Sequence, residues 1–131
     1  MNQEEINQID IKFNNAVLHK YMYKMPAKLH ALDVAAGVGR ITKELLLPNG
    51  FKHVDLLEQS STLMASARKK LAKQIPKQGK ARSFFEVGMQ DFNFMYKYDC
   101  IWINWGIGYL NKEDAVIFVK KCSANLRKVY P

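Results

Sequence analysis

The chain has 131 residues, 48% of them hydrophobic, which is enough for one domain with a core and too few for two. No stretch approaches the roughly 20 consecutive apolar residues of a membrane span. The first residues also lack the basic and then apolar pattern of a secretory signal. We therefore expect no membrane contact and a cytoplasmic or nuclear location.

The net charge of +8 raises the question of a nucleic-acid partner. Much of the excess lies between Arg68 and Arg82, in a stretch with no aromatic residue on which a base could stack. A solvated helix face followed by a loop explains this stretch more simply, so nucleic acid is not expected as a partner. Cys100 and Cys122 lack the spacing of metal ligands, which favours buried thiols and predicts no metal site.

The first segment, Glu4 to Lys24, has acidic residues early and lysines late, as the helix dipole favours. Its apolar residues recur at roughly helical spacing: Ile6, Ile9, Phe13, Val17, Leu18 and Tyr21. The pattern predicts one or two amphipathic helices within residues 1–25 that pack onto a sheet.

A strand, a glycine turn and a helix follow. The apolar run from Leu29 to Val34 predicts a buried strand, and Gly37 and Gly39 allow a sharp turn. Residues 40–47 then predict a helix that ends at a Pro/Gly breaker. Because glycines remove Cβ atoms and a helix start leaves N–H groups free, this arrangement is typical of a cradle for a nucleotide-type ligand.

The residues around the glycines indicate which ligand. Thr42 stands where a dinucleotide-binding turn has its third glycine, which weakens an NAD or FAD interpretation. Asp33 and Arg40 suit a ligand with an ammonium group, a carboxylate and a ribose, and S-adenosylmethionine (AdoMet) is such a ligand. Glu58 ends the next apolar run, where a carboxylate would accept both ribose hydroxyls.

The apolar run at residues 53–58 predicts a second strand, and two further strands are predicted after it. Ser60 or Ser61 caps a helix that runs to about Lys73, in which Met64 belongs to the core. Residues 82–87 form the third strand and lead into a turn. The near-continuous apolar run of residues 99–104 predicts a fourth strand covered on both faces.

Asn104 ends that fourth run, at the edge of an open α/β sheet where ligands bind. It is either the satisfied start of a loop or a ligand contact. Residues 111–114 then resemble a capping box that opens a last helix.

Three motifs in this order resemble those of the eukaryotic protein N-terminal methyltransferases. They are residues 31–43 (ALDVAAGVGRITK), 88–92 (GMQDF) and 98–110 (YDCIWINWGIGYL), and the similarity runs from about Ile9 to about Arg127. Members of this family methylate the α-amino group of protein N-termini of the X-Pro-Lys type. The resemblance implies an α/β Rossmann-like methyltransferase fold of three layers, with strands in the parallel order 3-2-1-4 and helices at the N-terminus.

The resemblance also implies the roles of individual residues. The cofactor-binding set is Ala35, Gly37, Gly39, Arg40, Glu58, Gln59, Ser60, Met89, Gln90 and Asn104. Trp105 and Tyr109 stand where the family has residues that line the acceptor channel. The alternative for Trp105 is a side chain buried in the core. Ala35 replaces the usual glycine, Asn104 the usual glutamine and Tyr109 a histidine, so no catalytic residue is assigned.

The family fold has a sheet of seven strands, of which four are predicted here. Residues 1–131 are thus expected to be one partial domain, with a helical segment at 1–25 and the cofactor-binding half at 29–131. The fourth strand would otherwise present an apolar edge. We therefore expect a fragment of a longer chain, or an edge covered by a partner or by a second copy of this chain.

Two functions of different classes remain open at this point. The first is AdoMet-dependent methylation of a protein or peptide N-terminus. The second is a catalytically inactive domain of the same fold that binds the cofactor or a partner protein. A third function, methylation of RNA, would depend on the basic charge alone.

Overall fold

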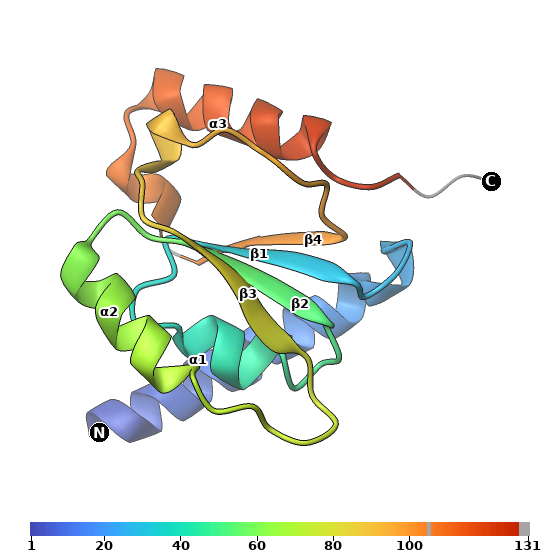
Figure 1. The fold of residues 1–131 in the computed structure, drawn as a ribbon, viewed down its shortest axis with the longest axis vertical. Helices are drawn as coiled ribbons and strands as arrows, with labels where there is room; N and C mark the ends of the chain where they lie inside the picture. The colour runs from blue at the N-terminus through green and yellow to red at the C-terminus, as the bar shows by residue number, and fades with distance from the viewer. Residues whose placement is uncertain (105, 129–131) are drawn as a thin grey trace.

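The computed structural model describes residues 1–104 and 106–128. In this part of the chain a parallel sheet lies between two layers of helices (Figure 1). Its strands are β1 (His30–Val34), β2 (His53–Leu57), β3 (Lys80–Phe85) and β4 (Cys100–Ile103). Its α-helices are α1 (Gln3–Tyr21), α2 (Ser61–Lys70) and α3 (Lys112–Ala124). Shorter helical segments are η1 (Met22–Lys24), η2 (Thr42–Leu46), η3 (Met89–Asp91) and η4 (Gly106–Tyr109).

The order of the described strands is β3-β2-β1-β4, and all neighbours are parallel. This confirms the predicted order. β1 lies in the middle, with Leu32 paired to Asp55 on one side and to Ile101 on the other. A strand buried on both faces explains why its sequence is an apolar run rather than an alternation.

Helices cover both faces of the sheet (Figure 1). On one face Leu18 of α1 and Leu45 of η2 pack with Ala31, while α2 packs through Met64. On the other face Phe118 of α3 packs with a set of apolar residues that includes Leu32. Met64 is fully buried, as predicted for a core residue.

Several element bounds differ from the sequence-based expectation. β3 begins at Lys80, two residues before the expected start, because the Lys80 N–H already bonds the Lys52 carbonyl. α2 ends at Lys70 rather than near Lys73. Residues 42–46 form a π-helical segment, in which the Leu47 N–H reaches the Thr42 carbonyl at 3.0 Å.

The orientation of α1 corrects a prediction. Its expected packing face is largely exposed to solvent: Ile9 is 56% and Phe13 68% exposed, and Ile6 and Tyr21 are also exposed. Within that predicted set, only Leu18 is fully buried.

Polar contacts explain this orientation, because they hold the opposite side of α1 against the body. Asn7 donates to Glu44 at 3.0 Å, and Asn15 accepts from Asn49 at 2.8 Å. An ion pair of 2.8 Å joins Asp10 to Arg40. The helix is therefore positioned by side-chain polar groups together with a few apolar contacts near its end.

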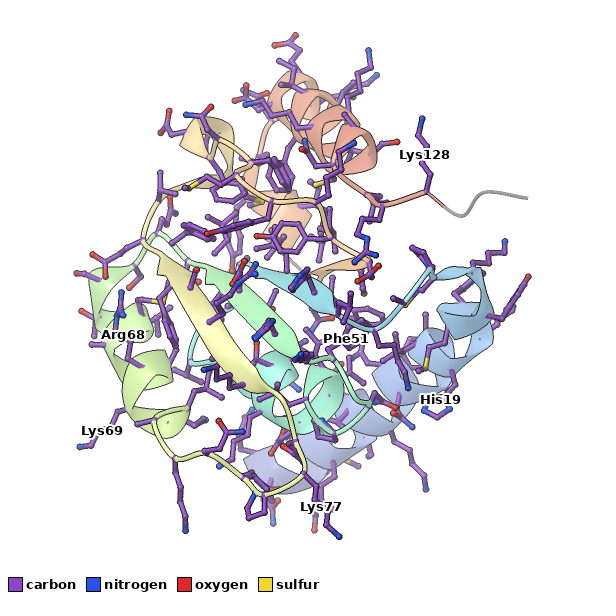
Figure 2. The ribbon with its side chains drawn as sticks, turned by 45° about the vertical axis from the view of Figure 1, so that its right-hand side comes forward. His19, Phe51, Arg68, Lys69, Lys77 and Lys128 are labelled. Carbon is purple, nitrogen blue, oxygen red and sulfur yellow. The ribbon has the colours of Figure 1, made fainter. Side chains whose placement is uncertain are left out.

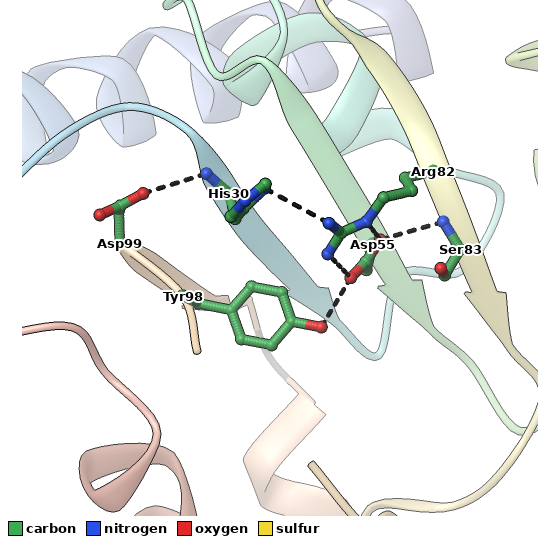
Figure 3. A network of polar contacts seen from close by, with 6 residues as sticks. All are labelled: His30, Asp55, Arg82, Ser83, Tyr98 and Asp99. Carbon is green, nitrogen blue, oxygen red and sulfur yellow. Dashed lines mark hydrogen bonds and ion pairs between the residues drawn. The ribbon is translucent and has the colours of Figure 1, made fainter. Parts of the chain in front are cut away.

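A buried polar network joins the strands near their amino ends (Figure 3). The Asp55 carboxylate accepts two hydrogen bonds from the Arg82 guanidinium, at 2.9 and 2.6 Å. It also accepts the Tyr98 hydroxyl at 2.7 Å and the Ser83 N–H at 3.0 Å. Since Asp55 is fully buried, these four bonds compensate the loss of its hydration.

Basic side chains point outward, as a solvated face requires. Figure 2 shows Lys69 and Lys77 extending from the surface, whereas Phe51 points into the interior. No helix in the described part of the chain is both long and apolar enough to cross a membrane. Cys100 and Cys122 are free and buried, as predicted.

In the described sheet β4 is an edge strand. Its residues after Cys100 are half-buried rather than buried. The expectation that a further strand, a partner or a second copy covers this edge remains a prediction, as does the division of the chain into two segments.

Candidate functional site

A pocket of about 390 Å³ opens beyond the carboxyl ends of the strands. This is the edge at which open α/β sheets bind ligands, and the volume is in the range of pockets for small molecules. It is lined by Ala35, Gly37, Leu57, Glu58, Gln59, Ser60, Leu63, Val87, Gly88, Met89, Gln90, Asn104, Gly106, Tyr109 and Leu110.

The glycine turn after β1 supplies one wall. Gly37 has a φ of +58°, a conformation that glycine adopts readily and L side chains rarely do. A Cβ added to it would meet nothing within 4 Å, so a side chain there would project into free space. The turn therefore leaves its backbone accessible to a ligand.

Glu58 follows β2 directly, and its side chain binds the glycine turn after β1. Its Oε1 accepts the Gly37 N–H at 2.9 Å, and its Oε2 accepts the Ser60 N–H at 2.8 Å. The residue is only 9% exposed and lines the pocket. Each carboxylate oxygen has a second lone pair, so both can still accept hydroxyl groups from a ligand.

Ser60 is also the N-cap residue of α2. Its hydroxyl oxygen accepts the Leu63 N–H at 3.2 Å, which confirms one of the two predicted helix caps. The cap fixes the backbone directly after Glu58. The orientation of the carboxylate is thus set by secondary structure on both sides.

The structure corrects the expectation for Asp33, which does not line the pocket. Its side chain lies on the opposite face of β1, where Oδ2 accepts the Thr42 N–H at 3.2 Å and the Thr42 hydroxyl at 2.7 Å. Burial raises the pKa of this carboxyl group to about 7, although the bonds from Thr42 oppose the shift. Asp33 therefore anchors the helical segment after the turn.

Two residues of the predicted cofactor set also lie outside the pocket lining. Gly39 has a φ of +85°, and a Cβ there would meet Leu71 at 3.0 Å and Ala67 at 3.4 Å, so this glycine allows α2 to approach. Arg40 points to α1, where it pairs with Asp10.

The turn after β3 forms the opposite wall. A Cβ on Gly88 would lie 3.0 Å from Oε1 of both Gln59 and Gln90, so a side chain there would displace these two amides by a few tenths of an ångström. Met89 is buried among the apolar residues under α3 while it still lines the pocket. Amide groups beside an apolar surface suit a flat, polar ring such as a purine.

The β4 side of the pocket contains Asn104, Gly106 and Tyr109, and the Tyr109 side chain is 84% exposed. Trp105 lies outside the described residues. Ala35 has a φ of +54°, although alanine rarely adopts the left-handed region.

The sequence interpretation brought most of the pocket together but missed some of its lining. Six lining residues were not assigned to the site, although three of them lie within the family motifs: Leu57, Leu63, Val87, Gly88, Gly106 and Leu110. The apolar members follow an ordinary core pattern and carry no signal of their own. Gly88 and Gly106 could have been found, because each lies just after a strand at the ligand-binding edge.

The site as a whole can hold a ligand with a diol, a polar ring and an apolar part. Glu58 is the one charged side chain among the described residues that line it. In the described part of the chain, no group of three His, Cys, Asp or Glu side chains is arranged to hold a metal ion.

Known proteins resemble the chain over nearly its whole length. Alpha N-terminal protein methyltransferase 1 of Dictyostelium discoideum is 39% identical over 127 residues, which cover 93% of this chain and 46% of that protein. N-terminal Xaa-Pro-Lys N-methyltransferase 1 of Homo sapiens is 37% identical over 127 residues, which cover 93% of this chain and 55% of that protein. The chain thus spans about half the length of the curated relatives it matches.

Solved structures agree in fold. A SAM-dependent methyltransferase of Leishmania major superposes with a TM-score of 0.80 at 29% identity, over 95% of this chain and 48% of that one. The glycopeptide N-methyltransferase MtfA, complexed with AdoMet, superposes with a TM-score of 0.69 at 23% identity, over 86% of this chain and 49% of that one. This similarity supports the fold only.

The family model described as AdoMet dependent proline di-methyltransferase matches residues 2–129. This match covers all three motifs and each strand of the described sheet. The chain belongs to this family of AdoMet-dependent methyltransferases.

Proposed function

We propose that the pocket binds AdoMet and that the protein methylates the α-amino group of protein N-termini of the Xaa-Pro-Lys type. The observation that carries the cofactor assignment is Glu58, whose carboxylate bridges the N–H groups of Gly37 and Ser60 and faces the pocket. The names of the relatives from Dictyostelium discoideum and Homo sapiens support the choice of acceptor.

The residues present fit this cofactor. Glu58 offers two acceptor lone pairs for a ribose diol, and Gln59 and Gln90 offer amides to the edge of an adenine ring. Met89 would pack against the face of the ring. The open space over Gly37 would admit the amino-acid part of the ligand close to the backbone.

AdoMet supplies a methyl group on a sulfonium, which a nucleophile removes by in-line displacement. The protein's main tasks are therefore to align the acceptor amine with that methyl group and to exclude water. An α-ammonium group has a pKa of about 7.7–8.0 and must lose its proton before it can attack. A proton acceptor within reach of the amine is thus a requirement of this reaction.

After β4 we assign a cofactor-binding role to Asn104 and a substrate-binding role to Tyr109. Asn104 is half-buried and lines the pocket, so its amide can contact the cofactor. Tyr109 lines the pocket and is largely exposed, so its ring can contact an incoming peptide. The same role for Trp105 remains a prediction from the family resemblance.

The basic charge of the chain is compatible with a lysine-containing substrate, because the basic cluster after residue 67 lies outside the pocket. Arg68, Lys69 and Lys77 belong to the α2 end and the following loop, and they do not line the pocket. With Glu58 as the charged group among its described lining residues, the pocket itself does not repel a cation.

The experiment is a methylation assay on a peptide that begins Ser-Pro-Lys, with mass spectrometry to detect added methyl groups. We expect methylation at the α-amino group and none on the same peptide acetylated at its N-terminus. Binding of S-adenosylhomocysteine without transfer to the peptide would favour a non-catalytic domain. Salt-sensitive methylation of RNA instead would contradict the proposal.

A further inference from the structure

Ala35 and Gly106 both line the pocket and lie against each other. Ala35 follows β1 directly and is held at a φ of +54°, in the left-handed region that glycine adopts readily and alanine resists. Elsewhere in the described chain, Lys77 is the one other non-glycine residue with a positive φ, and it lies in an exposed loop. The unfavourable conformation at Ala35 is thus located at the binding site itself.

Gly106 lies against the methyl group of Ala35. A Cβ placed on Gly106 would be 2.4 Å from the Cβ of Ala35, and 3.8 Å from the carbonyl oxygen of Val34. The first distance is far shorter than a contact between carbon atoms allows. The two positions therefore share one side-chain volume, which Ala35 fills.

The position of this contact gives it a function. β1 and β4 are neighbours in the sheet, and Ala35 and Gly106 follow their carboxyl ends. Glu58 and Gly88 follow β2 and β3, on the other side of the pocket. If the adenosine lies by Glu58 and Gly88, the sulfur-containing part of the ligand would extend toward Ala35 and Gly106, which line the pocket next to β1 and β4.

We propose that Ala35 and Gly106 form a steric pair that positions η4 and sets the depth of the pocket under the sulfur end of the ligand. The identity of that ligand rests on the proposed function, whereas the steric dependence does not. A glycine is required at 106 because alanine occupies 35, and η4, which includes Tyr109, approaches the pocket through this contact.

A double-mutant cycle tests the dependence. Gly106→Ala should raise the unfolding equilibrium constant about tenfold or more, because the added methyl group overpacks the site. In the Ala35→Gly background the same substitution should have a much smaller effect, since the competing methyl group is gone. Urea denaturation of the four proteins measures both effects without any ligand.

Calorimetric titration with S-adenosylhomocysteine provides the second readout. We expect Gly106→Ala to weaken binding about tenfold, and the double variant to recover most of the lost affinity. Gly108→Ala is the matched control, because a Cβ at this neighbouring glycine of η4 would meet nothing within 4 Å. The control should change neither stability nor affinity appreciably.

Each outcome is decisive. Additive effects of the two substitutions on stability would overturn the steric pair. If Gly106→Ala does not fold, a folded double variant supports the pair, whereas failure of the double variant beside a folded Ala35→Gly protein contradicts it. Coupling in stability without any binding of S-adenosylhomocysteine to the unmodified protein would leave the pair standing and refute the proposed cofactor.

Discussion

Two ion pairs in this molecule join the same residue types at similar distances but in different surroundings. Asp55 and Arg82 pair at 2.6 Å within the sheet, where the Asp55 side chain is 0% exposed (Figure 3). Asp10 and Arg40 pair at 2.8 Å between α1 and the helical turn after β1, where the Asp10 side chain is 23% exposed. Burial decides how much stability is lost when one partner is removed, because water can solvate the remaining charge only where that charge is exposed.

The sheet and α1 differ in the same way throughout. Buried carboxylates in the sheet each accept several hydrogen bonds, and apolar side chains fill the space around them. α1 is attached by polar side chains near the surface while much of its apolar side faces solvent. We therefore expect substitutions in the sheet to be more costly than substitutions of the polar or exposed side chains of α1.

The largest expected difference is between Asp55→Ala and Asp10→Ala. Removing Asp55 leaves the Arg82 guanidinium, the Tyr98 hydroxyl and the Ser83 N–H without their acceptor, so we expect a loss of about 3–5 kcal/mol in the free energy of unfolding. Asp10→Ala should cost distinctly less, about 1–2 kcal/mol, because both side chains of this pair are partly exposed. Urea denaturation compares the two, and equal losses would contradict the comparison.

A second matched pair lies within α1 itself. Leu18 is 1% exposed in the core, so Leu18→Ala should cost about 2–5 kcal/mol. Phe13 is 68% exposed, and Phe13→Ala should change the stability by about 0.5 kcal/mol or less. A large loss for Phe13→Ala at low protein concentration would mean that this side chain is covered in solution.

The pH dependence of stability should show the burial of Asp33. Its pKa is raised to about 7 in the folded protein, so the folded state retains a proton that the unfolded state releases near pH 4. Stability from this group is present at low pH and is lost as the pH rises through 7, by at most about 1.4 kcal/mol per pH unit. Asp33→Asn keeps an acceptor for Thr42 and should flatten the profile between pH 5 and 7.

A smaller effect of opposite sign is expected from His30 and His53, whose rings stack with centroids 5.3 Å apart. Burial and the nearby Arg82 lower the pKa of both imidazoles, although Asp99 and Asp55 oppose this at His30. Their neutral forms stabilise the fold above the ordinary histidine pKa, and this stability is lost as the pH falls below about 6.5. His53→Phe should reduce that acid-side loss in a urea titration at pH 5 to 7.

β1, β2 and β4 were predictable because they lie in apolar runs followed by glycines or polar residues, whereas β3 begins with the polar stretch at residues 80–83 and its start was misplaced. The strand order followed from the family resemblance, and the structure confirmed it. α1 was predicted as a helix, but the face that packs against the body was predicted wrongly, because the exposed Ile9 and Phe13 have the same spacing as core residues. Polar contacts such as Asn7 with Glu44 outweigh that pattern, and they join residues far apart in the sequence.

The site shows a similar limit. Glu58 and the glycine turn could be located from spacing alone, and Glu58 and Gly37 line the pocket. Asp33 also lies near a strand end, yet the alternation of side chains along β1 directs it to the other face and into the interior. The dependence between Ala35 and Gly106 is invisible in the sequence, because it requires the distance between two strand ends.

The most direct test of the account is calorimetric titration of S-adenosylhomocysteine into the unmodified protein, Glu58→Gln and the surface control Glu113→Gln. We predict binding at a single site, unchanged in the control and weakened about tenfold or more in Glu58→Gln, because an amide cannot accept a diol as a carboxylate does. Absence of binding to the unmodified protein, or equal affinity in Glu58→Gln, would contradict the assignment of this pocket to the cofactor.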